Sequence, residues 1–249
     1  MGKKIGIAVG LGAAMLVLAA AVVWFWGGSG EPSAEVTAPT IRTTTTIPTQ
    51  ITDTTSTAIS GTAAVEVSTG QVIFDVDKTQ SSVQFEIDEI RDAEPRHVIG
   101  TTSEVAGQIL IDFDNPENSQ LGTIVINLRT LSTGSQFRDR AIRGPILGSE
   151  SSENEFAQFN PTSIDGLPES VAIGDIVSVS IAGDLLVSGT TNQVVFEVEI
   201  VIESRERIHI IGSAKVLRSD FGLSIPSVPR IASVSDEISL VLDLVALSG

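Results

Sequence analysis

The stretch from Val194 to Glu203 reads VVFEVEIVIE and decides the fold class. Apolar residues occupy every second position of this stretch, and Glu197, Glu199 and Glu203 lie among them. An alternation of period two is typical of a β-strand with one buried face and one solvated face. The stretch therefore predicts an antiparallel strand whose apolar side packs against a core.

The same alternation recurs in seven further segments after Gly70. They cover residues 74–76, 83–87, 105–113, 124–128, 177–187, 208–216 and 238–244. Eight such segments predict an all-β domain and favour a closed up-and-down antiparallel barrel over a small sandwich, although the pattern does not fix the strand order. Between Leu131 and Glu169 the alternation disappears, which predicts a long insertion with one or two short helices.

In a barrel, one set of alternating apolar side chains faces the interior and is available to a ligand. We expect this set to contain Phe74, Phe85, Ile109, Ile111, Phe113, Val179, Ile181, Phe196, Val198, Ile210 and Leu240. The same residues would pack on one another in a barrel that holds no ligand. Gly107, Gly183 and Gly212 lie on the same faces, where they would leave room for a ligand or allow the strands to bend.

The chain opens with a candidate membrane anchor. Lys3 and Lys4 precede an uncharged stretch from Ile5 to Trp26, which as a helix is long enough for a hydrocarbon core of about 30 Å. The lysines place the N-terminal end in the cytoplasm. A cleaved signal peptide is the alternative, but its apolar region is usually shorter and ends at small residues rather than aromatic ones. We therefore predict a cytoplasmic stub and a transmembrane anchor at 1–27.

The segment from 28 to 70 is rich in threonine and proline and poor in apolar bulk. Such a composition cannot cover a core, so we expect a disordered, flexible linker. The β-domain then occupies 71–249. The whole predicts a single-pass membrane protein whose C-terminal domain lies outside the cytoplasm, either in a periplasm or at the cell surface.

Composition argues against several classes of function. A formal net charge of −16 repels phosphate backbones, so nucleic acid is not an expected partner. The chain has no cysteine and two histidines, His97 and His209, and it lacks a Gly-x-Ser-x-Gly elbow, so we expect neither thiol nor serine-triad catalysis. The acidic run from Asp112 to Glu117 lacks the glycine of a calcium loop and is interpreted as a polar turn. We predict no enzyme, metal or cofactor.

A dense charged cluster lies in the irregular insertion. It consists of Arg138, Asp139, Arg140 and Arg143. One interpretation is an arginine–aspartate pair that fixes this loop to the barrel. The other is a barrel entrance at which the arginines meet an anionic headgroup.

Five motifs resemble those of the YceI-like family and follow that family's order over roughly residues 72–247. The motifs are Phe74-x-Val-Asp with Ser-Ser-Val83-x-Phe85, Gly107-x-Ile-x-Ile-Asp-Phe113, Leu131-Ser-Thr-Gly with Arg138-Asp139, Ile181-x-Gly-Asp-Leu185 with Gly189-Thr-Thr191, and Arg218-Ser-Asp-Phe-Gly222. The first is similar to the family's first hairpin. The departures are Arg140-Ala-Ile142, where the family has His-Leu, and a missing Tyr-Pro near Phe156.

The resemblance implies a lipocalin-like antiparallel barrel whose apolar interior holds a long amphiphile, a polyisoprenoid in known members. It also implies a periplasmic or secreted setting and no shared catalytic residues. We therefore expect a membrane-tethered binding protein for an isoprenoid or another long-chain amphiphile. The alternative is a barrel filled by its own side chains, which would act as a structural or protein-interaction domain of the cell envelope. No protein partner can be named from the sequence.

Overall fold

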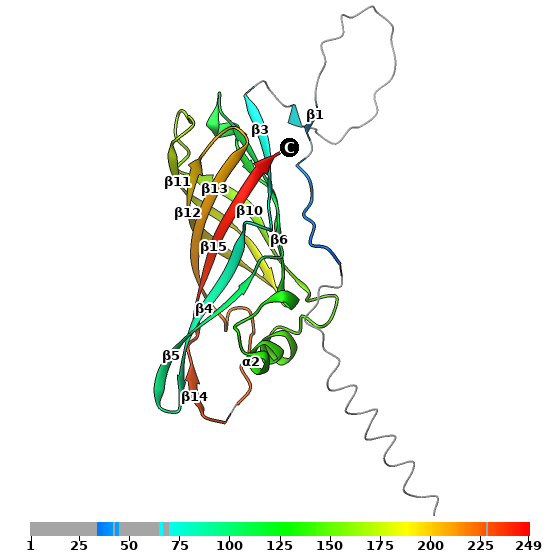
Figure 1. The fold of residues 1–249 in the computed structure, drawn as a ribbon, viewed down its shortest axis with the longest axis vertical. Coiled ribbons are helices and arrows are strands. Elements are labelled where there is room, and N and C mark those ends of the chain that lie inside the picture. The colour runs from blue at the N-terminus through cyan, green and yellow to red at the C-terminus, as the bar shows by residue number, and fades with distance from the viewer. Residues whose placement is uncertain (1–33, 42, 45–64, 67–69, 228) are drawn as a thin grey trace, which may run out of the picture.

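A computed structural model describes residues 34–41, 43–44, 65–66, 70–227 and 229–249. Most of them form one strongly curled antiparallel sheet with few helices (Figure 1). The strands of this sheet are β3 (Gln71–Val76), β4 (Ser82–Arg91), β5 (Glu94–Thr102), β6 (Val105–Ala106), β7 (Gln108–Asp112), β8 (Gln120–Leu121), β9 (Ile124–Asn127), β10 (Phe156–Asp165), β11 (Ile176–Val187), β12 (Thr190–Ile202), β13 (Arg207–Leu217), β14 (Ile231–Val234) and β15 (Glu237–Ser248). The predicted all-β, antiparallel fold class is confirmed.

Strands β9 to β13 follow one another as antiparallel neighbours, and β15 continues the sheet beyond β13. On its other side β15 pairs with β3 through residues 246–248 and with β4 through residues 239–243. Because both pairings are antiparallel, β3 and β4 run in the same direction along one partner. The expected first hairpin at residues 74–85 is therefore wrong, and the hairpin is formed by β4 and β5 instead.

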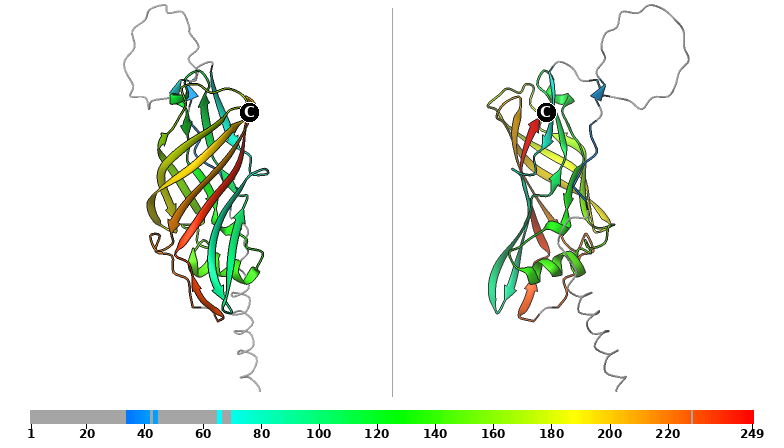
Figure 2. Two further views of the ribbon diagram at one scale, coloured as in Figure 1. Left: turned by 90° about the vertical axis from the view of Figure 1, so that its left-hand side faces the viewer. Right: turned by 45° about the vertical axis from the view of Figure 1, so that its right-hand side comes forward.

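Gly107 separates β6 from β7 at the place where two parts of the sheet meet. β6 pairs with β9, whereas β7 pairs with β3. The backbone N–H of Val76 donates to the carbonyl oxygen of Gly107 at 3.0 Å. The segment β6–Gly107–β7 is thus paired with β9 at one end and with β3 at the other. This pairing brings distant parts of the sheet together, and the sheet curls around an interior (Figure 2).

Four strands of the sheet, β5, β8, β10 and β14, were missed by the sequence pattern, and two of them, β8 and β14, are only two and four residues long. In β5 the inward positions include Gly100, where an added Cβ would collide with the ring of Phe85 on the neighbouring strand. The aromatic side chain thus covers the position that an apolar residue of β5 would fill. In β10 only Ala157 and Phe159 are buried, and the register shifts after Pro161, so the alternation is too short to recognise.

Short helices gather at one end of the sheet, beside the β4–β5 hairpin and β14 (Figures 1 and 2). They are α2 (Gln136–Ala141) and the π-helix η3 (Ile142–Ile146), and two 3-10 turns, η1 (Pro116–Asn118) and η2 (Leu128–Thr130), lie elsewhere in the chain. The predicted short helices between 131 and 169 are confirmed. The same interval also contains β10.

The N-terminal predictions fall largely on residues that the structure does not describe. The predicted anchor from Ile5 to Trp26 lies outside the described residues. Within the described ranges, no helix combines the length and the apolar character needed to cross a membrane. Of the predicted linker, β1 (Thr43–Thr44) and β2 (Val65–Glu66) are described and pair in parallel.

Residues 34–41 lie against the sheet rather than away from it. Val36 is only 5% exposed, and the backbone N–H of Ile41 donates to Oε1 of Gln108 at 2.6 Å. The carboxylate of Glu35 lies 3.4 Å from Nζ of Lys78. These contacts depend on a few individual side chains, which is why the average composition of the linker does not predict them.

Candidate ligand-binding cavity

The curled sheet encloses a cavity of about 440 Å³. Its lining is overwhelmingly apolar and comes from β4, β7, β9, β10, β11, β12, β13 and β15, that is, from all around the sheet. Ligand-binding cavities in proteins typically measure 300–1,000 Å³ and are lined by apolar side chains with a few polar groups. Both the size and the lining therefore suit a small or chain-like apolar ligand.

Nine of the eleven predicted interior residues line this cavity. They are Phe85, Ile109, Ile111, Val179, Ile181, Phe196, Val198, Ile210 and Leu240. Phe74 is fully buried opposite Ile109 in the β3–β7 pair but does not reach the cavity. Phe113 follows the last residue of β7, and its ring lies under the guanidinium of Arg205, with 4.7 Å from Cζ to the ring centroid. Phe113 is partly buried against the hydrophobic core, but it lies beyond the end of β7 and does not line the cavity.

Two of the three inner-face glycines do not leave the free space that their lack of a side chain suggests. A Cβ added at Gly183 would lie 2.5 Å from the ring of Phe159, and one added at Gly107 would collide with Ile124. At Gly212 the side chains of Leu242 and Val198 approach to 3.4 Å. Neighbouring side chains have therefore taken up the room at Gly183 and Gly107, whereas a Cβ at Gly212 would lie at ordinary van der Waals distance from its neighbours.

Phe159 and Phe196 form an edge-to-face pair inside the cavity. Their ring centroids are 5.1 Å apart and the rings meet at 75°. Edge-to-face packing is a favoured geometry of aromatic pairs. Phe159 belongs to the missed strand β10, so this pair was not predicted, although the sequence contains both rings.

Among the residues that the structure describes, five exposed ones line the cavity, and four of them lie at the α2 end. These four are Arg91, Phe137, Pro226 and Pro229, and the fifth, Gln120, lies toward the other end. Phe137 is 73% exposed although it lines the cavity. The cavity therefore reaches the surface chiefly between α2, the end of β4 and the loop before β14. At the opposite end the partly buried Leu167 and Val171 cover it.

The predicted entrance cluster divides into one cavity residue and three others. Arg138 lines the cavity, and its Nη2 lies 3.4 Å from Oε1 of Glu89. Asp139 is buried, and its carboxylate accepts hydrogen bonds from the hydroxyl and backbone N–H of Thr133 at 2.6 and 2.7 Å. Arg143 donates to the carbonyl oxygens of Asp139 and Arg129, whereas Arg140 is exposed and does not line the cavity.

Asp139 thus fixes the loop as one interpretation expected, but through Thr133 and Ser132 rather than through an arginine. Arg138 keeps the entrance interpretation open. Sequence reasoning named neither Glu89 nor Arg91, which also line the cavity. Both follow from the alternation of β4, because Val83, Phe85 and Ile87 are succeeded on the same face by Glu89 and then Arg91.

A buried polar cluster stiffens the chain just before and after the helices. Glu155 is 1% exposed, and its Oε2 lies 3.1 Å from Nη1 of Arg129. The amide of Asn127 donates to Oε1 of Glu155 at 3.0 Å, and Arg129 also donates to the carbonyl oxygen of Ser149 at 2.6 Å. These contacts tie the end of β9 to the start of β10 and to the loop that follows η3.

Neither histidine lines the cavity. His97 bonds Asp88 at 2.8 Å, and His209 bonds Asp243 at 2.7 Å, both on the outer face of the sheet. The hydrogen bond to Asp88 raises the pKa of His97, and the charges of Asp88 and Glu86 add to this against the opposing effect of burial. In the part of the chain that the structure describes, no three His, Asp or Glu side chains are grouped to hold a metal.

The acidic run after β7 is a turn, as its sequence suggested. The carboxylate of Asp112 accepts hydrogen bonds from the backbone N–H groups of Asn115 and Asp114 at 2.9 and 3.1 Å. The side chain of Gln71 donates to the same carboxylate at 2.9 Å. Asp112 therefore closes its own turn and ties it to β3.

A model of the YceI-like domain family matches residues 74–246. Two solved structures are similar in fold. One is a polyisoprenoid binding domain from Saccharophagus degradans implicated in plant cell wall breakdown, with a TM-score of 0.58 and 14% identity over 72% of this chain and 99% of that one. The other is BcnA from Burkholderia cenocepacia, with a TM-score of 0.54 and 18% identity over 68% and 98%. No curated protein matches the sequence.

Proposed function

This chain belongs to the YceI-like domain family, and on that premise we propose that its β-domain binds an isoprenoid or another long-chain amphiphile in its interior. The observation that carries the proposal is the apolar cavity of about 440 Å³ enclosed by the curled sheet. A polyisoprenoid is the natural candidate, because the similar domain from Saccharophagus degradans is described as binding one.

We also infer that the sheet is a closed, lipocalin-like barrel with eight strand positions. Short strands that lie end to end count as one position around the barrel. β3 and β4 form one such position beside β15, and β14 and β15 form a second one beside β4. β5, β6 and β7 form a third. β9, β10, β11, β12 and β13 supply the other five. Pairing on both sides of Gly107 supports closure, and a barrel of this size has room for one small ligand.

The apolar lining suggests how binding would depend on the ligand. Each buried methylene contributes about 0.8 kcal/mol, so a five-carbon prenyl unit contributes roughly 3–4 kcal/mol before the costs of ordering the chain. Affinity should therefore rise steeply with chain length until the cavity is full, and then level off. A barrel filled by its own side chains would show no such dependence.

The experiment is uptake of a prenol series by the full-length chain, held in amphipol if its N-terminal segment keeps it in membranes. Organic extraction with mass spectrometry first identifies any chain that co-purifies. Native mass spectrometry then compares ten-, fifteen- and twenty-carbon prenols on the delipidated protein. Length-dependent uptake supports the proposal, whereas no extracted lipid and no uptake at any length would leave the filled barrel as the function to pursue.

We further propose that the domain is tethered to a membrane and lies outside the cytoplasm, which would keep a lipid carrier close to the bilayer that supplies it. The support is the sequence pattern at 1–27, where two lysines precede an apolar stretch long enough to cross a bilayer. Washing membranes at alkaline pH tests the tether. Retention of the full-length chain supports an anchor, and release into the supernatant indicates a cleaved signal peptide.

A further inference from the structure

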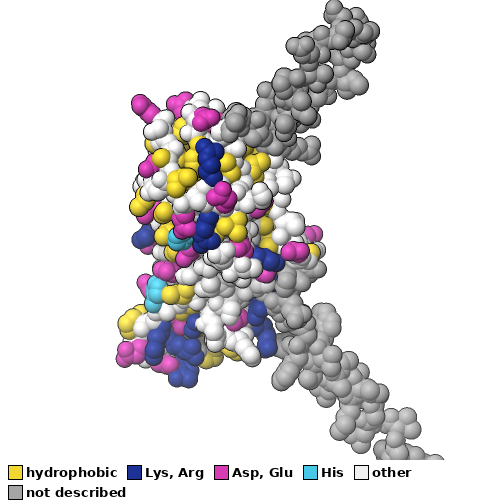
Figure 3. Space-filling view, turned by 45° about the horizontal axis from the view of Figure 1, so that its top comes forward, with side chains coloured by type: hydrophobic (Ala, Val, Ile, Leu, Met, Phe, Trp, Pro, Cys, Tyr) yellow, Lys and Arg dark blue, Asp and Glu magenta, His cyan; other side chains and the backbone are white. Residues whose placement is uncertain are grey.

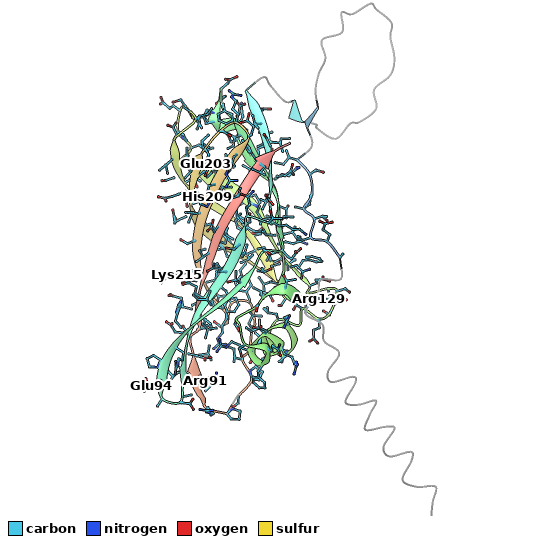
Figure 4. The ribbon with its side chains drawn as sticks, viewed as in Figure 1. Arg91, Glu94, Arg129, Glu203, His209 and Lys215 are labelled. Atoms are coloured by element: carbon cyan, nitrogen blue, oxygen red, sulfur yellow. The ribbon has the colours of Figure 1, made fainter. Side chains whose placement is uncertain are left out.

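The inner face of β4 changes character along its length. Val83, Phe85, Ile87, Glu89 and Arg91 occupy alternate positions, and all five line the cavity. Side chains two residues apart in a strand share a face, so this row is apolar for three positions and charged for the last two. The charged positions lie where β4 passes α2 and β14, at the end where the cavity reaches the surface (Figure 4).

Two further elements bring charge to the same end of the cavity. Arg138 comes from α2, and Arg218 follows the last residue of β13. Together with Glu89 and Arg91 they are the charged residues of the lining within the described part of the chain. Toward the opposite end the polar lining residues are Ser119 and Gln120, which carry no charge. The cavity thus has an apolar body and one charged end. Figure 3 shows a group of Lys and Arg side chains, with Asp and Glu beside them, at the lower end of the molecule.

The positive charges in the lining exceed the negative ones. Glu89 is 5% exposed, and its charge is matched by Arg138 at 3.4 Å. Arg218 donates to the carbonyl oxygens of Ser235 and Leu223 and lies 3.5 Å from Asp236. Each of these two guanidinium groups therefore already has a carboxylate nearby.

Arg91 is different. Its guanidinium makes no ion pair or hydrogen bond with any residue in the described ranges. Glu94 is its cross-strand partner in the β4–β5 hairpin, but the two do not form an ion pair. The neighbouring Asp92 is instead held by Arg230 through two contacts of 2.6 and 2.8 Å. An exposed, unpaired guanidinium thus stands at the rim of an apolar cavity.

We propose that this end of the cavity binds the head of the amphiphile and that the head is anionic, a phosphate or a carboxylate. The inference rests on the proposed function and specifies its ligand class. Guanidinium groups bind both kinds of oxyanion through paired N–H donors. Arg91, at the end of β4, supplies the free donor, and Arg138 on α2, whose contact with Glu89 is long, lines the same end of the cavity. The lining at this end has more arginines than carboxylates, so the chain of the amphiphile enters the apolar body with its head held at Arg91.

The test compares ligands that share a chain and differ in their heads, added to the delipidated full-length protein. Geranylgeranyl phosphate is compared with geranylgeraniol, and palmitate with hexadecanol, by native mass spectrometry and calorimetry. We expect each anionic ligand to bind at least tenfold more tightly than its alcohol at low salt, with a gap that narrows as salt rises. The phosphate and carboxylate arms show which oxyanion is preferred. Inorganic phosphate alone, which lacks the chain, should bind weakly.

Arg91→Gln is the diagnostic variant, because the Arg91 guanidinium makes no ion pair or hydrogen bond within the described ranges that the substitution would break. It should reduce the preference for the anionic head to within about threefold of the alcohol and leave the affinity for the alcohol unchanged. Lys215→Gln is the control, since Lys215 pairs with Glu237 on the outer face of the sheet and should retain the full preference. The double substitution Glu89→Gln with Arg138→Gln removes both charges of the pair together, so that Glu89 is not left as an unpaired buried carboxylate. It should also reduce the difference in affinity between the anionic ligand and its alcohol.

Three results would overturn the inference. The first is equal affinity for the anionic ligands and the alcohols, which would indicate a neutral head held without the arginines. The second is a loss of alcohol and phosphate binding together in Arg91→Gln, which would make Arg91 structural. The third is an unchanged preference in Arg91→Gln. In each case chain binding itself survives in the wild-type protein, whereas failure of the proposed function would abolish uptake of every ligand.

Discussion

Ala157 and Ala214 offer a direct test of whether the interior is a cavity or a packed core. Both alanines are buried, at 3% and 7% exposure, and both belong to the hydrophobic core. Ala157 lines the cavity, but Ala214, on β13, does not. The same substitution to leucine therefore places three extra carbon atoms into open space at one position and into packed side chains at the other.

The sign of the change in the free energy of unfolding separates the two cases. At about 0.8 kcal/mol for each buried carbon, Ala157→Leu gains about 2.4 kcal/mol. Loss of rotamer freedom removes roughly 0.5–1 kcal/mol, which leaves a net stabilisation of about 1.5–2 kcal/mol. Ala214→Leu overpacks its site instead, and such changes typically cost about 1–3 kcal/mol. In a domain of this size each kcal/mol moves Tm by about 2–4 °C.

The assay is urea denaturation of the delipidated full-length protein, followed by circular dichroism in the β-sheet region. We expect the midpoint to rise for Ala157→Leu and to fall for Ala214→Leu. Ala157→Leu should also weaken binding of a twenty-carbon prenol, because the leucine occupies space that the chain would fill. Equal destabilisation by both substitutions would refute the reasoning, since it would mean that Ala157 is as tightly packed as Ala214 and the barrel is already full.

Three further predictions concern the elements around the cavity. Glu155→Ala should lower the free energy of unfolding by about 3–5 kcal/mol, because Arg129 is left without its buried partner, and denaturation midpoints would show it. Burial opposes ionisation of Asp112, but hydrogen bonds from Asn115 and Gln71 outweigh it and lower its pKa below 3.8. Its contribution is therefore complete above pH 3.8 and is lost as the pH falls through the lowered pKa, so the stability difference from Asp112→Asn should shrink in acid. Phe137→Ser should slow prenol uptake in stopped-flow mixing while leaving stability nearly unchanged, since Phe137 is 73% exposed at the mouth; an unchanged rate would place the entry route elsewhere.

Most of the sheet could be predicted because its long strands have one dry face and one wet face. β11, β12 and β13 carry this pattern over most of their lengths, and β15 carries it in its sequence from Ile238 to Leu244, so each was located from the sequence. Alternation does not reveal strands whose inner positions are small residues covered by an aromatic ring of a neighbouring strand. In β5 the ring of Phe85 covers Gly100, which has no side chain of its own. In β10 only two positions are buried before the register shifts at Pro161. The inner face of such a strand is covered partly by side chains of neighbouring strands, so the sequence of the strand itself does not show the alternation.

Strand connectivity was harder to predict because alternation carries no information about partners. β3 and β4 look like two arms of a hairpin, since a polar turn at residues 77–81 separates them. In the structure Ser81 donates to the carbonyl oxygen of Asp77 and accepts from the backbone N–H of Val245 on β15. Residues 77–81 therefore do not reverse the chain but connect two strands that both pair with β15. The contact between Ser81 and Val245 holds this connection, and no local sequence pattern predicts a contact over such a distance.

Alternation also predicts which side chains point inward better than it predicts how much space they leave. Nine of the eleven expected interior residues line the cavity, yet two of the three inner-face glycines that suggested free volume, Gly107 and Gly183, have a neighbouring side chain in the place of their missing Cβ. Free volume is a property of opposing strands together, because a large side chain on one strand can occupy the place left by a small one on the next. Phe159 over Gly183 is such a case. The character of the lining, by contrast, is local to each strand, and so the charged end marked by Glu89 and Arg91 follows from β4 alone once its alternation is continued past Ile87.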